Sequence, residues 1–152
     1  MPRIKNCILI KETPLKVFEI TNDIEKWSLL FKEYKSSNVL THSREGRFSK
    51  LTFELGNGKN KWRSWRILDK EDLVAIAQRV EPMYPFEYMH LTWSYEENEN
   101  GTIMTWIQDF ELDKSFPESL EVVCKRMNEH TKVNQNRIKE IIETNALEAY
   151  EI

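Results

Sequence analysis

The 152-residue chain has few cysteines, no long apolar run and no excess of positive charge. Its two cysteines, Cys7 and Cys124, lie far apart without metal-ligand spacing, so we expect reduced thiols in a cytoplasmic protein. No apolar stretch approaches membrane-spanning length, and the first five residues lack the apolar core of a signal peptide, so we expect neither a membrane span nor a secretory leader. The formal net charge of −3 argues against nucleic-acid binding.

The sequence also lacks internal repeats, low-complexity tracts and any interdomain linker. We therefore expect residues 1–152 to form one domain, long enough to bury a real core. What the chain does have is aromatic side chains: five Trp, five Tyr and seven Phe. Core packing accounts for many of them, but the number of tryptophans favours a cavity walled by flat rings.

Alternating apolar residues separated by turn signals predict seven β-strands. Glu45-Gly46, Asn57-Gly58 and the stretch 98–101 fit tight hairpin turns. The expected strands cover 3–11, 37–44, 47–55, 60–69, 72–81, 86–97 and 102–112.

Three helices complete the expected fold. Thr13 caps the first. Asn22-Asp23 breaks it and caps a second short helix, on which Trp27, Phe31 and Tyr34 share one face at i, i+4 and i+7. A long third helix is expected from about 117 to about 148. This order predicts an α+β fold in which a curved antiparallel sheet surrounds the long C-terminal helix and leaves a cavity between them.

The most informative spacing lies on one strand. Trp62, Ser64 and Arg66 are two residues apart, so they share one face of the sheet, whereas Trp65 lies on the other. If that face is concave, the protein holds a buried cation among aromatic rings, a setting that suits an oxygen-rich ligand. The alternative is structural: Arg66 pairs with a carboxylate such as Asp109, or lies on the outer face.

The inward faces of neighbouring strands and helices add further candidates for the cavity wall. Tyr34 could be a rim residue, and Asn134 could simply bond a helix carbonyl. Gln108 interrupts an apolar alternation and needs a partner if it is buried. The three histidines show no spacing typical of a metal site or a catalytic triad. The candidates outside the 60–69 strand are Trp27, Phe31, Tyr34, Met89, Trp93, Trp106, Gln108, Met127 and Asn134.

Several segments carry a family resemblance. They are Thr21-Asn22-Asp23-Ile24 with Trp27, Leu30-Phe31 and Glu33-Tyr34; Trp62-x-Ser64-x-Arg66; Gln78-Arg79-Val80-Glu81; Met89-x-Leu91-x-Trp93-x-Tyr95; Gly101-Thr102-x-Met104-x-Trp106-x-Gln108-Asp109-Phe110; and Met127-Asn128 to Ile138-Lys139. These segments resemble the aromatic polyketide aromatase/cyclases of the START-like, helix-grip superfamily. The resemblance follows almost the whole chain in order, except for residues 40–60 and the last ten or so.

The resemblance implies a reaction, partners and roles for individual residues. Such proteins receive a linear poly-β-ketone on an acyl carrier protein, alongside other polyketide synthase components, and direct aldol ring closure and dehydration. Arg66 and Tyr34 would be catalytic, and the pocket tryptophans, Ser64 and Asn134 would bind the substrate. No metal or organic cofactor is expected, because the α-protons of a β-diketone are already acidic.

Elementary chemistry agrees with these roles but leaves alternatives open. A preorganised cation such as Arg66 can stabilise an enolate or alkoxide oxygen. Tyr34 near that cation would favour its phenolate form and could shuttle protons. One alternative is an aromatase that removes water from a ketoreduced first ring. Another is a non-catalytic carrier of lipids or small ligands, which would not need a cation aimed into its cavity.

Overall fold

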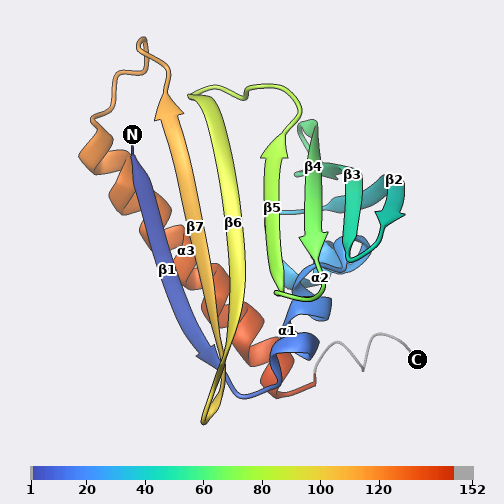
Figure 1. The fold of residues 1–152 in the computed structure, drawn as a ribbon. Helices are drawn as coiled ribbons and strands as arrows, with labels where there is room; N and C mark the ends of the chain where they lie inside the picture. The colour runs from blue at the N-terminus through green and yellow to red at the C-terminus, as the bar shows by residue number, and fades with distance from the viewer. Residues whose placement is uncertain (1, 146–152) are drawn as a thin grey trace.

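The computed structural model describes residues 2–145 and shows an antiparallel seven-stranded sheet with helices on its concave side (Figure 1). The strand order is β1-β7-β6-β5-β4-β3-β2. This is the α+β, helix-grip arrangement predicted from the sequence. The elements are β1 (Arg3–Ile10), α1 (Pro14–Thr21), a 3-10 turn (Ile24–Lys26), α2 (Trp27–Leu30), β2 (Ser36–Glu45), β3 (Phe48–Gly56), β4 (Lys61–Asp69), β5 (Val74–Arg79), β6 (Phe86–Asn98), β7 (Gly101–Leu112) and α3 (Leu120–Glu143).

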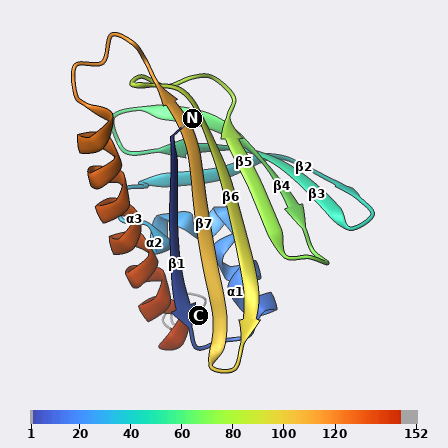
Figure 2. The ribbon, with the colours of Figure 1, turned by 60° about the vertical axis from the view of Figure 1, so that its left-hand side comes forward.

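The first strand is separated from the second by the whole width of the sheet. β1 pairs with β7, and the short helices carry the chain across to the opposite edge, where β2 begins. Hairpins then return the chain strand by strand. Two register positions shape the cavity wall: Trp93 lies opposite Trp106, and Arg66 lies opposite Ala77. Figure 2 shows that the sheet bends, so that its β2–β4 part splays away from α3.

Strand β5 is shorter than predicted. The expectation was a strand over 72–81, but Leu73 has a positive φ of 54° within the preceding turn, and the regular strand begins one residue later. The other strands agree with the prediction to within one residue at each end.

Helix α3 lies along the β1 side of the sheet (Figures 1 and 2). It begins three residues later than expected, because the Ser119 side chain caps it by accepting the Val122 N–H at 3.2 Å. The regular helix ends at Glu143, and the remainder of the predicted helix, at 146–148, falls outside the described residues. No helix in residues 2–145 is long and apolar enough to cross a lipid bilayer.

The second helix is much shorter than predicted. It ends at Leu30, and Phe31 is already extended at φ −119° and ψ 124°, so the expectation that Tyr34 lies on a helical face is wrong. The cause is a contact that the local sequence does not reveal. The Arg137 guanidinium, on α3, donates to the carbonyl oxygens of Leu29 and Leu30, which satisfies groups that a longer helix would bond itself.

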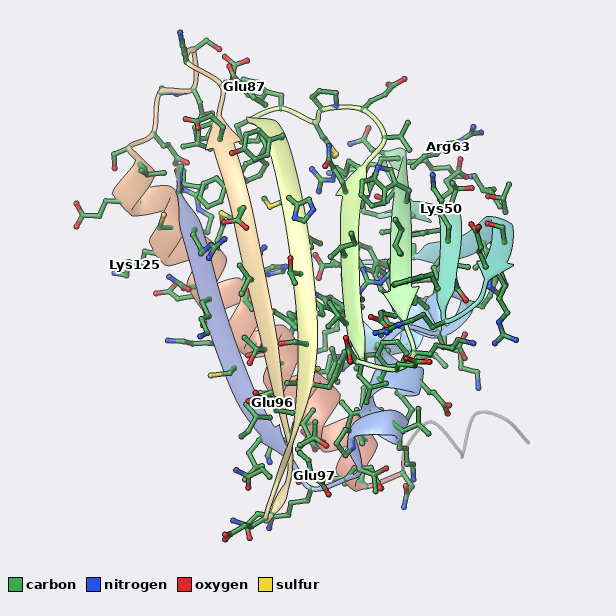
Figure 3. All side chains as sticks on the ribbon, viewed as in Figure 1. Lys50, Arg63, Glu87, Glu96, Glu97 and Lys125 are labelled. Atoms are coloured by element: carbon green, nitrogen blue, oxygen red, sulfur yellow. The ribbon has the colours of Figure 1, made fainter. Side chains whose placement is uncertain are left out.

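Apolar packing leaves room between two parts of the interior. The larger cluster joins α1, α2 and the second half of α3 to the sheet, and includes Phe18, Leu30 and Ile138. A smaller cluster around Ile4 and Phe110 fills the other end, under the first half of α3. Arg63, on β4 between Trp62 and Ser64, projects outward instead and lies at the surface (Figure 3).

Candidate active site

A cavity of about 330 Å³ lies between the concave face of the sheet, α2 and α3, a size typical of small-molecule sites. Its wall is formed mainly by aromatic rings, with a few polar groups among them. All twelve side chains singled out from the sequence are on this wall: Trp27, Phe31, Tyr34, Trp62, Ser64, Arg66, Met89, Trp93, Trp106, Gln108, Met127 and Asn134. Their location agrees with the prediction, whereas their roles remain predictions.

Arg66 is 1% exposed, as deeply buried as Phe53 on the same cavity wall. Its Nε donates to the Asn22 Oδ1 at 2.8 Å, and its two terminal nitrogens have no hydrogen-bond partner among residues 2–145. The structural alternative was a pair with Asp109, but Asp109 accepts from the Arg3 Nε at 2.7 Å. The interpretation of Arg66 as an ion-paired or outward-facing residue is therefore wrong.

Small and flat neighbours make room for this cation. Ala77, the strand partner of Arg66 on β5, has no side chain long enough to block the guanidinium. The guanidinium carbon lies 4.1 Å from the Trp93 ring centre and 5.2 Å from that of Trp27, so the ring faces partly compensate for lost water. Burial lowers the pKa of Arg66 to about 10, which leaves the group charged at neutral pH.

Asn22 holds the guanidinium in place, a role that sequence reasoning missed. Its amide nitrogen donates to the Phe18 carbonyl oxygen at 2.9 Å and to the Tyr95 hydroxyl oxygen at 3.1 Å. These bonds fix the amide so that its oxygen faces Arg66. The Tyr95 hydroxyl is itself paired with the Thr21 hydroxyl at 2.6 Å, and burial raises the pKa of Tyr95 to about 12. The sequence presented Asn22 only as a helix breaker.

Tyr34 lies on the cavity wall, half buried, with its ring stacked 5.8 Å from that of Trp27. Burial raises the pKa of Tyr34 well above its ordinary value, and the Glu33 charge raises it further. Arg79 and Arg66 lower it by less. The expectation of a phenolate is therefore wrong: the Tyr34 hydroxyl stays protonated at neutral pH and can act as a hydrogen-bond donor or an acid.

Three polar side chains join the α2–β2 connection to α3 at the edge of the cavity. The Glu33 carboxylate accepts from the Asn134 amide at 2.9 Å and pairs with the His130 Nε2 at 3.0 Å. The alternative that Asn134 merely bonds a helix carbonyl is thus wrong. Burial alone would raise the pKa of Glu33, but His130 and Asn134 bring it below its ordinary value; the same hydrogen bond raises the pKa of His130.

Replacing Glu33 with glutamine is expected to lower the pKa of His130, because the neutral amide removes the charge that favours the imidazolium. Because Glu33 raises the pKa of His130 in the folded protein above its unfolded value of about 6.5, the stabilisation from the charged pair is fully present below that value. This stabilisation is lost as the pH rises through the higher folded pKa of His130. An NMR titration of the imidazole signals measures the shift. Asn134→Ala keeps the Glu33 charge and serves as the control; equal His130 pKa values in wild type and Glu33→Gln would contradict this electrostatic account.

Arg79 is a second cavity cation that sequence reasoning passed over as a site. Arg79, on β5, lies opposite Ser64 on β4, and its guanidinium carbon is 5.7 Å from the Trp62 ring centre. Burial lowers the pKa of Arg79, while Tyr34 and Glu33 raise it. The signal was present in the sequence: Arg79 follows Ala77 by two residues and so shares its inward face.

The remaining polar groups are held by their own partners. Gln108 accepts from the Thr131 hydroxyl at 3.1 Å, which meets the expected need for a partner. Gln135, next to Asn134, is buried and donates to the Asn6 carbonyl oxygen at 3.2 Å, away from the cavity lining. Asn134 is therefore the α3 amide on the cavity wall.

Groups that could hold a metal are not gathered in this part of the protein. Within residues 2–145, no three His, Cys, Asp or Glu side chains come together in a way that could bind a metal ion. Both cysteines are unpaired; Cys7 is exposed and Cys124 is half buried.

Comparison with protein families supplies the decisive observation. Residues 11–138 match the family described as "Polyketide cyclase / dehydrase and lipid transport". The chain belongs to this family. Among curated proteins, a Streptomyces cyaneus protein named "Putative polyketide cyclase" is 39% identical over 129 residues, which cover 84% of each chain. A Streptomyces halstedii protein of the same name is 36% identical over 94 residues, which cover 60% of this chain and 84% of the relative.

Several solved structures share the fold of this chain. The di-domain ARO/CYC BexL from the BE-7585A biosynthetic pathway has a TM-score of 0.75 and 16% identity, over 94% of this chain and 47% of that one. The Zhui aromatase/cyclase from Streptomyces sp. R1128 has a TM-score of 0.70 and 12% identity, over 95% and 93%. A START superfamily protein from Mycobacterium smegmatis has a TM-score of 0.64 and 14% identity, over 97% and 98%.

Proposed function

We propose that this protein closes a ring of a carrier-bound poly-β-ketone by intramolecular aldol addition and then drives dehydration to an aromatic product. The observation that supports this most is the Arg66 guanidinium: buried on the cavity wall, charged at neutral pH, and without a carboxylate partner among residues 2–145. A site of this kind provides a preorganised positive charge for an oxygen that becomes negative during the reaction.

The reaction follows from the acidity of the substrate and the positions of these groups. A methylene between two carbonyls loses a proton to water, and the resulting enolate carbon forms a bond to a carbonyl carbon further along the chain. The attacked carbonyl becomes an alkoxide, which the Arg66 charge stabilises and the protonated Tyr34 hydroxyl can neutralise. Loss of the hydroxyl together with an α-proton, as water, leaves the double bond from which the aromatic ring forms.

The aromatic wall supplies the other requirement, a defined fold for a flexible chain. A free poly-β-ketone can close in several ways, so much of the catalysis consists of holding two particular carbons together. The parallel rings of Trp93 and Trp106, with centres 4.1 Å apart, form a rigid flat stack on the cavity wall. Such a surface fits a product that becomes planar as it forms.

A carrier without catalysis is less well supported by the same cavity. A carrier needs no cation on its cavity wall, whereas Arg66 lies there without a carboxylate partner among residues 2–145. The partner that delivers the chain would be an acyl carrier protein. Lys32 and Lys35, both exposed and on either side of Glu33 and Tyr34, are the basic residues proposed to contact it.

The test is a product assay with a poly-β-ketone attached to its acyl carrier protein, in parallel with a ketoreduced chain. We expect the wild-type protein to convert the mixture of spontaneous products from the unreduced chain into one aromatic product. Tyr34→Phe, which removes only the hydroxyl, is expected to lower the rate of ring closure about 10²-fold while ligand binding persists. An unchanged product mixture with wild-type protein would refute the proposal, and conversion of the reduced chain alone would favour the dehydrating aromatase.

A further inference from the structure

Three buried donor nitrogens of cavity-lining side chains lack a hydrogen-bond acceptor among the described residues. Two are the terminal nitrogens of Arg66, and the third is the indole Nε1 of Trp106. Trp106 is 5% exposed, so water in bulk cannot satisfy this donor. An unmatched buried donor costs folding free energy, and proteins keep few of them. Both side chains line the same cavity, which suggests that a ligand supplies the missing acceptors.

The neighbouring tryptophan shows that this packing can satisfy an indole. The Trp27 Nε1 donates to the Thr21 carbonyl oxygen at 3.0 Å. Trp27 and Trp106 lie on the same cavity wall, yet only the first uses its N–H within the protein. The Trp106 ring contributes stacking against Trp93, a role that phenylalanine could also fill. Its unmatched N–H therefore points to a function outside folding.

The two sets of donors lie on opposite sides of one ring. The Arg66 guanidinium carbon and the Trp106 ring centre are each 4.1 Å from Trp93, and the Trp106 ring is parallel to it within 7°. Two groups this close to one ring cannot occupy the same face, so Trp93 separates them. The strand order agrees, because Arg66 on β4 and Trp106 on β7 flank β5 and β6. The two donors therefore reach different ligand atoms.

We propose that the Trp106 Nε1–H donates to a second substrate oxygen, distinct from the one held by Arg66, and so determines which carbons of the chain meet. This inference rests on the proposed function for its substrate class, a chain with several acceptor oxygens. With one carbonyl held on each side of Trp93, the segment between them has a defined length. Trp106 then fixes the regiochemistry of closure, while Arg66 stabilises the charge.

The direct test is the indole N–H signal of Trp106 in ¹H–¹⁵N NMR spectra of the wild-type protein. We expect heptane-2,4,6-trione, a short poly-β-ketone, to move this signal downfield, because the N–H acquires an acceptor. Naphthalene, a flat probe without acceptors, should produce only the smaller shifts of ring contact. The Trp27 N–H is the internal control, since it already has a partner and should not show the acceptor-dependent shift.

The binding affinity of a Trp106 variant tests the same proposal. Trp106→Phe keeps an aromatic ring and removes the donor, so it should weaken triketone binding by roughly 2- to 12-fold, the value of one ordinary hydrogen bond, and leave naphthalene binding nearly unchanged. A purely structural role would weaken both probes alike. In the product assay, the variant should yield a mixture of ring closures rather than a slower single one.

Three outcomes overturn the inference: equal displacement of the Trp106 signal by both probes, equal triketone affinity in wild type and Trp106→Phe, or no triketone binding at all. The NMR measurement uses the wild-type protein, so it holds even if the variant folds poorly. Failure of the proposed function looks different. In that case the Trp106 signal responds to the triketone, yet the wild-type protein forms no ring from the carrier-bound chain.

Discussion

Replacing Arg66 with methionine is expected to slow ring closure by about 10²–10³-fold, the cost of losing one preorganised oxyanion donor in a buried site. Methionine is unbranched and flexible and fills part of the space beside Ala77, so it removes the guanidinium while keeping an apolar side chain at this position. The spontaneous chemistry of the substrate would then dominate, and the product assay should return the mixture seen without protein.

The same replacement should leave the protein at least as stable as wild type. Burial lowers the pKa of Arg66 from 12.5 to about 10, which corresponds to a folding cost on the order of 3 kcal/mol. Against this gain, the Asn22 Oδ1 loses its donor, which costs about 1–3 kcal/mol. Urea unfolding of the two proteins measures the balance.

Arg66→Lys is the matched control for charge. It retains a cation but not the planar fork that reaches both Asn22 and the rings, so we expect an intermediate rate. Loss of activity in the methionine variant together with a large loss of stability would contradict our account, because Arg66 would then be a structural residue. Unchanged products in that variant would remove the basis of the proposed mechanism.

The largest effect on stability is expected from Gly101→Ala, which should lower the free energy of unfolding by about 3 kcal/mol or more. Gly101 opens β7 with a φ of +143°, a conformation that L side chains rarely adopt. A Cβ there would also overlap the carbonyl oxygen of Ile10, a backbone atom that cannot move aside cheaply. Next to it, the Thr102 hydroxyl bonds the Glu12 carbonyl oxygen at 2.6 Å, so the hairpin anchors the turn that leads into α1.

Gly46→Ala is the control for this experiment. Gly46 also has a positive φ, of +60°, but a Cβ there meets no atom within 4 Å, so only the conformational cost of about 1–2 kcal/mol applies. Chemical denaturation of both variants gives their free energies of unfolding, and the difference separates the cost of the positive φ from the cost of the overlap with the Ile10 backbone. Equal losses at the two positions would show that the contact with Ile10 adds nothing.

The sequence predicts the sheet well because its information is local. Alternation along β4 places Ser64 and Arg66 on one face and Arg63 on the other, and the structure confirms each position. Period-two patterns of this kind depend only on strand geometry. The prediction that this strand faces a cavity with an aromatic wall followed from the same pattern on the neighbouring strands.

The errors arise where distant residues decide. The second helix stops at Leu30 because Arg137, more than a hundred residues away, bonds the carbonyl oxygens at its end. The prediction of a Tyr34 phenolate considered the nearby cation but not desolvation, which depends on how the whole cavity closes. Asn22 likewise had a local explanation as a helix breaker, and only the packing of α1 against the sheet brings it to Arg66.

Ala77 has a consequence for how such a protein changes its preference over time. It is the smallest side chain on the cavity wall and lies between Arg66 and Leu91 on the adjacent strands. Each methyl group added there would take space that the Arg66 guanidinium borders. A valine or leucine at 77 would thus shrink the cavity and displace the buried charge together, so on the proposed mechanism the size of the product and the rate of its formation cannot change independently at this position.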